Sequence, residues 1–297
     1  MNKETKGTIL ALLAAIISGV SIPLNKIFVV NLDPLVFTSI RSLIIGVVFL
    51  AITRFRHERI DKKINIKYLA LIAIIGGAFA FLLFFDGLKL TTSGRAAFLH
   101  KTMPLYIIVL AFLFLKEKIT KKHLYCILLM LIGTAAIYYS DIASDPLWLN
   151  PSLGDLLIIG ATVLWAIENI IARKVMIKES NFIVSFARMF FGGVILLSIV
   201  LILGKFEALM SLNSQQLINI GISTIILFSY VLLWYWSLKL INVSKASILL
   251  LLSPVISFLI GAGFLNEPTP YTQIMGSALI LVGAYFVSNI KSESRSI

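Results

Sequence analysis

The chain has 297 residues, of which 59% are hydrophobic and only 13% are charged, and its formal net charge is +12. A soluble protein of this length needs far fewer apolar residues for its core, so the composition indicates an integral membrane protein. The basic residues lie at the ends of apolar runs and form no single patch, which argues against nucleic-acid binding.

Ten apolar runs follow one another along the chain, each long enough to cross the roughly 30 Å hydrocarbon layer of a bilayer. The first run follows two lysines, as a signal peptide would, but it is too long for one and has a counterpart in mid-chain. We therefore expect an all-α integral membrane protein with ten transmembrane helices, over 7–30, 35–53, 68–86, 93–115, 123–139, 154–176, 182–203, 217–240, 243–265 and 271–289.

The two halves of the chain resemble each other residue by residue. The segment 85–118 recurs 150 positions later, and the spans before it recur at an offset of 147. Each copy holds five spans, an odd number, so the copies are expected to form inverted repeats, as in many secondary transporters. The pairs that align include Pro104 with Pro254, Glu117 with Glu267 and Arg41 with Arg188.

Positive charges predict the orientation of the chain. If the N-terminus is cytoplasmic, 19 of the 26 Lys and Arg residues fall on cytoplasmic segments, and the loop between spans five and six holds no base. We therefore expect a multi-pass protein of the cell membrane with both termini in the cytoplasm. The expected division is a first repeat over 1–140, an external linker over 141–153, a second repeat over 154–290 and a cytoplasmic tail over 291–297.

This pattern resembles the drug/metabolite transporter superfamily, and within it the EamA-type transporters with two five-helix repeats. The resemblance is carried by the paired arginines and prolines, by LKLTTSGRA and LKLINVSKA before spans four and nine, and by LKEKIT and LNEPTP at their ends. It implies a small-molecule exporter or permease in which helices one to four and six to nine enclose a central cavity, while helices five and ten are peripheral.

Duplication also sorts the candidate residues. Residues that both halves share are expected to serve the scaffold or the gates, whereas polar residues present in one half only are expected to contact the cargo. Arg41 and Arg188 lie about seven residues, roughly 10 Å, into their helices and must face protein or water at that depth. They are candidates for an anion contact or, because they are symmetric, for a structural or gating role.

Three further shared or small residues are candidate hinges. Pro104 and Pro254 each remove one backbone hydrogen bond from a transmembrane helix. Gly19 continues a face of small residues begun by Ala11 and Ala15, a pattern typical of closely packed membrane helices.

Lys101 occurs in one half only, since its repeat partner is Leu251. It lies roughly 12 Å into its span and three residues before Pro104, whose freed carbonyl is tolerated beside a cavity or a partner. Lys101 could hold a carboxylate or phosphate there, or it could snorkel to the outer surface. His100, which aligns with Leu250, is expected to be a packed histidine more than a proton carrier.

Glu168 aligns with Ser21, and the neighbouring Asn169 aligns with an isoleucine. Glu168 lies about fourteen residues, roughly 21 Å, into its span. A carboxyl group at this depth could exchange a proton or bind an ammonium group. The alternative is a salt bridge, with Arg188 or Lys174 as the partner.

Aromatic residues on spans three and eight could stack on a planar ligand or a cation, or they could form interfacial belts. Two of them, on span eight, join the candidate set. The candidate substrate-binding residues are Lys101, Glu168, Arg41, Arg188, Asn169, His100, Tyr230 and Trp234.

These features predict a secondary transporter, an exporter or permease that moves a small polar metabolite across the cell membrane by alternating access. Three buried bases against one main acid favour an anionic or zwitterionic cargo, an amino acid or related carboxylate. Its expected partners are this small molecule, with a proton as a candidate coupling ion, and the lipid bilayer. The protein is expected to be a monomer or homodimer.

The alternative function is an intramembrane enzyme that acts on a lipid or small molecule. The chain has no His-Glu-x-x-His site and no glycine-rich P-loop, and Cys126 is its single cysteine. A passive channel would need a recurrent filter sequence, which is also missing. We therefore expect no catalytic residue, no cofactor and no metal.

Overall fold

A computed structural model describes the chain except for residues 1, 29–31, 59–65, 145–148, 266 and 292–297. The described residues form helices, which confirms the predicted all-α membrane fold, and nine of their spans are long and apolar enough to cross a membrane. The tenth is α7 (Lys121–Ile137), with 17 residues. The end of the first predicted span, part of the predicted linker and nearly all of the predicted tail lie outside the described residues.

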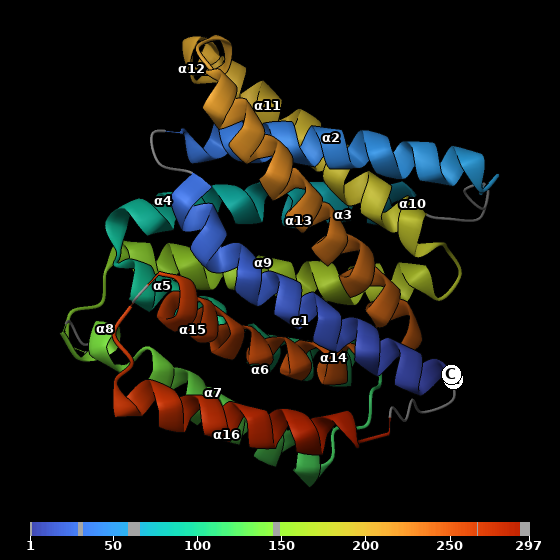
Figure 1. Ribbon diagram of the computed structural model, residues 1–297. Coiled ribbons are helices and arrows are strands. Elements are labelled where there is room, and N and C mark those ends of the chain that lie inside the picture. The colour runs from blue at the N-terminus through green and yellow to red at the C-terminus, as the bar shows by residue number, and fades with distance from the viewer. Residues whose placement is uncertain (1, 29–31, 59–65, 145–148, 266, 292–297) are drawn as a thin grey trace.

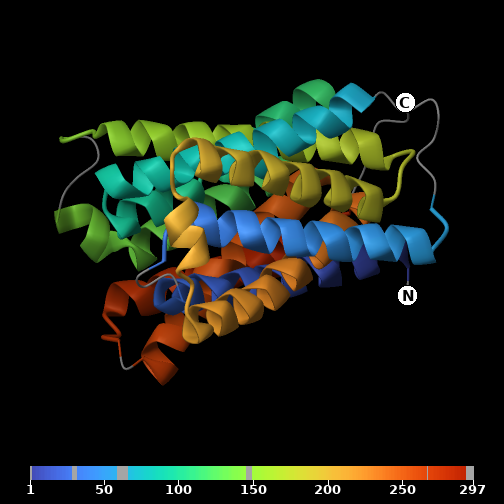
Figure 2. The ribbon, with the colours of Figure 1, turned by 90° about the horizontal axis from the view of Figure 1, so that it is seen from above.

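The spans run back and forth along one direction, as both ribbon views show (Figures 1 and 2). Spans three, four, seven and nine are divided into shorter elements. Besides α7, the spans are α1 (Lys3–Phe28), α2 (Pro34–Phe55), α3 (Ile66–Ile74) with η1 (Ile75–Phe79) and α4 (Ala80–Leu90), α5 (Ser93–His100) with α6 (Met103–Phe114), α9 (Leu153–Met176), α10 (Asn181–Phe186) with η2 (Ala187–Phe191) and α11 (Gly192–Ile202), α13 (Ser214–Leu240), α14 (Val243–Leu249) with η3 (Leu250–Leu252) and α15 (Ser253–Phe264), and α16 (Tyr271–Ser288). The short helices α8 (Tyr139–Ser144) and α12 (Phe206–Met210) lie in connections.

The third span is longer than predicted, because it continues through Asp86 to Leu90. Asp86 accepts a hydrogen bond of 2.8 Å from Lys89 one turn later, which stabilises the added turn. Gly87 lies where α4 meets α9, and a Cβ atom there would come within 2.9 Å of the Gly154 carbonyl oxygen. The glycine therefore serves close helix packing and does not end the helix.

The main helix contacts between the two halves recur with the equivalent helices of the opposite halves. α1 packs along α13, and its repeat counterpart α9 packs along α4. In contrast, α2 packs on α11 and α7 packs on α16, so each of these pairs joins a helix to its own counterpart. A two-fold relation between the halves produces this exchange. With five spans in each half, the relation is inverted.

α7 and α16 lie side by side at one edge of the bundle, away from α2 and α11 (Figure 1). Gly133 and Gly276 allow their backbones to approach, because a Cβ atom on Gly133 would lie 2.6 Å from the Gly276 carbonyl oxygen. Membrane helices use small residues in this way where they cross closely. The pair agrees with the peripheral position that the resemblance implies for helices five and ten.

We expect the substitution Gly276→Ala to lower the thermal stability of the purified protein by about 1–3 kcal/mol, because the added methyl group would overpack the contact with Gly133 and Ile137. The matched control is Gly221→Ala on α13, where no atom lies within 4 Å of an added Cβ atom. A melting curve of each variant in the same detergent measures the difference. Equal melting temperatures would show that the α7–α16 crossing is not close-packed.

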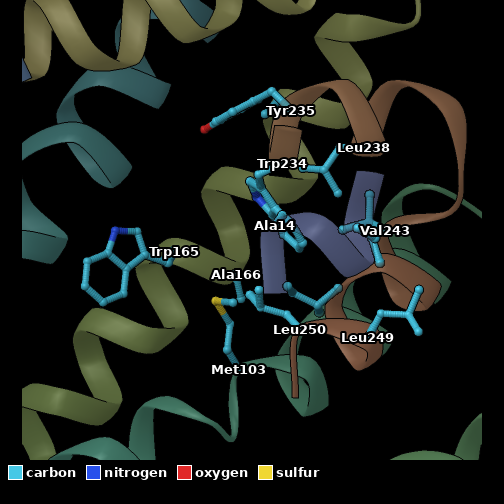
Figure 3. Packing of buried hydrophobic residues seen from close by; sticks show 14 of the residues in the cluster. Ala14, Met103, Trp165, Ala166, Trp234, Tyr235, Leu238, Val243, Leu249 and Leu250 are labelled. Carbon is cyan, nitrogen blue, oxygen red and sulfur yellow. The ribbon is translucent and has the colours of Figure 1, made fainter. Parts of the chain in front are cut away.

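Apolar side chains fill the centre of the bundle and also cover its outside. The apolar core includes Trp234 and Leu238 of α13 beside Ala14 of α1 and Leu249 of α14 (Figure 3). On the outside, large side chains such as that of Phe112 remain exposed. A protein surrounded by lipid gains nothing from hiding such residues.

Asp33 links the two halves at the start of α2. It caps α2 by accepting hydrogen bonds from two backbone amides, and the amine of Lys205 lies 2.5 Å from its carboxylate. Burial by itself would raise the pKa of Asp33, but the hydrogen bonds from Lys205 and the amides of Val36 and Leu35 hold this pKa below its usual value. Asp33 is therefore ionised at neutral pH.

Candidate functional site

Glu168 of α9 lies at the centre of a buried polar cluster, with only 1% of its surface exposed. Its Oε1 accepts a hydrogen bond from the hydroxyl of Tyr235 on α13. Its Oε2 lies 3.7 Å from Nε of Arg188. Figure 3 shows the Tyr235 oxygen projecting away from the apolar side chains of its own helix. The salt bridge weighed from the sequence is therefore present, with Arg188 as the partner.

Gly76 brings the first half of the chain against this cluster. An added Cβ atom there would collide with the Glu168 side chain. The Gly76 carbonyl accepts a hydrogen bond of 3.1 Å from Nε1 of Trp165 and lies 3.5 Å from Nη2 of Arg188. Gly76 belongs to the π-helical turn η1 and Arg188 to η2, and π-helical turns inside α-helices are frequent at functional sites.

Asn169 extends the cluster by one residue along α9. Its side-chain oxygen accepts a hydrogen bond of 2.9 Å from Nε1 of Trp234, and its nitrogen donates to the Trp165 carbonyl at 2.8 Å. Tyr230 stacks on Trp234 with a ring separation of 6.2 Å and an interplanar angle of 9°. We call Glu168, Asn169, Arg188, Trp234 and Tyr235 the central cluster.

His100 lies beside the central cluster and makes aromatic contacts. Its ring centre is 5.0 Å from that of Trp165 and 5.6 Å from that of Phe84, edge to face in both cases. Its Nδ1 is buried and has no hydrogen-bond partner within the described part of the chain. The packed histidine expected from the sequence is therefore found, at the edge of the predicted site.

Lys101 is buried and does not snorkel to the surface, so that alternative is wrong. It lies in the turn between α5 and α6, where its Nζ donates a hydrogen bond of 2.7 Å to the Ser253 hydroxyl at the start of α15. The described residues offer this amine no carboxylate. Lys101 and Glu168 thus do not touch each other in this conformation.

The two prolines mark interruptions at matching places in spans four and nine. Pro104 opens α6 and Pro254 opens α15, each within the first two residues of the helix. The Leu99 carbonyl, in the turn before Pro104, accepts a hydrogen bond of 2.6 Å from the Thr102 hydroxyl. This is the local compensation that a broken membrane helix needs. The hydrogen bond between Lys101 and Ser253 therefore joins one interruption to the other.

Gly19 of α1 packs against the interruption in span nine. A Cβ atom on Gly19 would lie 2.6 Å from the Ser253 carbonyl oxygen, and the Gly19 carbonyl accepts a hydrogen bond of 2.8 Å from Ser257. All three candidate hinge residues thus border broken helices, although a hinge motion remains a prediction.

Arg41 occupies a separate buried site, although it aligns with Arg188 in sequence. Its Nη1 donates hydrogen bonds to Ser223 at 2.6 Å and to Asn25 at 3.3 Å, and its guanidinium lies 3.8 Å from the ring centre of Phe37. Of these two arginines, only Arg188 has an acidic partner in the described structure. The two arginines align in sequence, which favoured one shared structural role, but their contacts in the structure differ.

The candidate set from the sequence did not include Tyr235, Trp165 and Ser253. All three differ in type from their repeat partners, which are Phe85, Ser18 and Met103, so a comparison of the halves could have found them. Each carries a polar group or ring that the other half lacks. The rule that singled out Glu168 applies equally to them.

Two cavities lie at opposite ends of α9. One of about 710 Å³ is lined by the end of α4, the first turn of α5 and the residues just before α9, including Thr91, Arg95 and Ser152. The other, of about 430 Å³, is lined by Arg56, Lys239 and residues between α9 and α10. Neither cavity is lined by a residue of the central cluster. Among the described residues, no group of three or more His, Cys, Asp or Glu side chains could hold a metal ion.

A sequence profile of the EamA-like transporter family matches residues 5–139 and 152–289, which together span nearly the whole chain. A Bacillus subtilis protein named "Uncharacterized transporter YetK" is 27% identical over 98% of this chain and 89% of its own length. An Escherichia coli protein named "Probable amino-acid metabolite efflux pump" is 24% identical, with 94% of both chains covered.

A solved crystal structure shares the fold. It superposes with a TM-score of 0.76 at 17% sequence identity and covers 95% of this chain and 98% of its own. The profile and the names of the relatives agree with the prediction of a transporter and not an enzyme.

Proposed function

Because this chain belongs to the EamA-like transporter family, we propose that it is a secondary transporter that moves an amino acid or a related carboxylate by alternating access. The cargo binds between the interrupted spans and the central cluster. The candidate residues, their roles, the repeat boundaries and the cytoplasmic position of both termini are parts of this proposal.

The observation that carries the proposal is Lys101, a buried amine that donates a hydrogen bond to a hydroxyl and meets no carboxylate in the described structure. A charge at membrane depth is costly unless a partner or a water-filled cavity offsets it. A cargo carboxylate beside Lys101 would supply that partner. Ser253, which already accepts a hydrogen bond from Lys101, would help to orient the carboxylate.

The central cluster supplies the opposite charge. Glu168 is held by Arg188 and Tyr235, and both contacts can rearrange when an ammonium group or a proton reaches the carboxylate. Trp165 donates to the carbonyl of Gly76, which packs against Glu168, and its ring contacts His100, the residue before Lys101. A zwitterion would thus meet a base at one end and an acid at the other. The name of the Escherichia coli relative supports this cargo class.

Counterflow in sealed vesicles tests this function. The purified protein is placed in vesicles loaded with an unlabelled amino acid, and uptake of the same labelled compound is followed over time. We expect saturable uptake that internal cargo accelerates, because alternating access couples the two directions through one site. Uptake that neither saturates nor responds to internal cargo across a panel of amino acids and carboxylates would refute the proposal.

A further inference from the structure

Two ion pairs, each with a buried base, join the halves of the protein, one at each end of the bundle. We call the end where α1 begins and α16 finishes the terminal end, and the end where α9 begins the far end. At the far end, Arg95 of α5 forms an ion pair with Asp155 of α9. At the terminal end, Lys245 of α14 pairs with Glu4 of α1 at 2.6 Å.

The bases of the two pairs are equivalent under the internal repeat, and their acids lie at similar places. Arg95 is the third residue of α5, Lys245 is the third residue of α14, and they align at the offset of 150. Asp155 and Glu4 both lie in the first turn of the helix that begins their half. With the offset of 147, Asp155 corresponds to Thr8, which lies one turn along the same face from Glu4.

Further hydrogen bonds hold each ion pair to neighbouring segments. Nη2 of Arg95 donates to the Asn150 carbonyl at 2.8 Å, and the hydroxyl of Thr91 donates to Asp155 at 2.6 Å. At the terminal end, Nζ of Lys245 donates to the Ile290 carbonyl at 2.6 Å.

Both bases are nearly inaccessible, with exposures of 2% for Arg95 and 1% for Lys245. Each lies at the first turn of an interrupted span, between its end of the bundle and the Lys101–Ser253 contact. A cargo that moved along spans four and nine to the proposed site would therefore pass a base that binds the opposite half. Both pairs are formed together in this structure.

We propose that Arg95–Asp155 and Lys245–Glu4 are the two gates of the transport cycle, and that each ion pair breaks when its own end opens while the other stays formed. This inference rests on the alternating access proposed above. It adds four residues, all outside the candidate cargo site, that determine which face the site opens to. If both ion pairs were purely structural, neither would break during transport. Accessibility of the residues beside each pair distinguishes the two cases.

Cysteine labelling reads the two gates separately. In a Cys126→Ala background, Ala96→Cys reports the far gate and Ala246→Cys the terminal gate, because these alanines follow Arg95 and Lys245 directly and are fully buried. A membrane-impermeant maleimide is applied to each face of the membrane. Labelling needs no cargo, so it tests the gates even if the proposed cargo is wrong.

We expect Asp155→Asn to accelerate labelling of the far probe about tenfold from one face only, without accelerating the terminal probe. Glu4→Gln should accelerate the terminal probe from the opposite face only. In Asp155→Asn, the side-chain amide can still accept the cap hydrogen bond that the Ser152 backbone donates to Asp155. If the far-gate variant does not fold, Glu4→Gln decides the question, because 31% of the Glu4 side chain is already exposed.

Asp33→Asn is the matched control. It also removes an ion pair between the halves at the far end, with Lys205, but that pair is partly exposed and lies between α2 and the end of α11. We expect it to change neither probe. The proposal is overturned if the gate variants leave labelling unchanged, if one variant opens both probes, or if Asp33→Asn acts like Asp155→Asn.

Discussion

Glu168→Gln is expected to abolish transport and to destabilise the protein by about 3–5 kcal/mol, because the change leaves Arg188 buried without its counter-charge. The glutamine keeps the shape of the side chain, so the loss would report charge and not packing. Melting curves of the purified protein and counterflow in vesicles measure the two effects.

A second substitution separates stability from transport. In Glu168→Gln with Arg188→Met, no charge remains unpaired, so much of the stability should return while transport stays absent. Glu207→Gln on α12, an exposed glutamate, is the matched control and should change neither quantity. Full transport by Glu168→Gln would remove the central cluster from the cargo site.

Lys101→Ala is expected to reduce counterflow of an amino acid at least 30-fold. Truncating one partner of a buried charged contact costs roughly 2 kcal/mol or more, which corresponds to such a factor. Lys101→Arg should retain part of the activity, because it keeps the positive charge that a carboxylate needs. Initial rates of labelled amino-acid uptake at equal protein density measure both variants.

Lys122→Ala, at an exposed lysine near the start of α7, provides the same chemical change away from the site. It should transport at the original rate. If Lys101→Ala transports as well as Lys122→Ala does, the amine plays no part in cargo binding and only the transporter assignment remains.

The spans and their inverted arrangement were predictable because both depend on one-dimensional patterns. Bilayer thickness sets the length of each apolar run, and the offsets of 150 and 147 relate the halves without any coordinates. The exception was the end of span three, where Asp86 and Gly87 look like a turn. Their role depends on α9, whose Gly154 meets Gly87 across the bundle.

The site was predictable only in part, because sequence gives depth along a helix and says little about rotation around it. The depths of Glu168 and Lys101 suggested a common cavity, but Lys101 faces Ser253 of span nine. Likewise, the alignment of Arg41 with Arg188 could not reveal that only one of them faces a carboxylate in the described structure. Such facts depend on which helices converge.

Ligand-dependent thermal stability tests the central claim, that a carboxylate-bearing cargo is held by Lys101, most directly. A ligand that binds only the folded protein stabilises it by about 2.7 kcal/mol at one hundred times its dissociation constant. Amino acids and carboxylates should raise the melting temperature of the unaltered protein, amines without a carboxylate should not, and Lys101→Ala should lose the response. Stabilisation by such amines, or an undiminished response of Lys101→Ala to carboxylates, would contradict the claim.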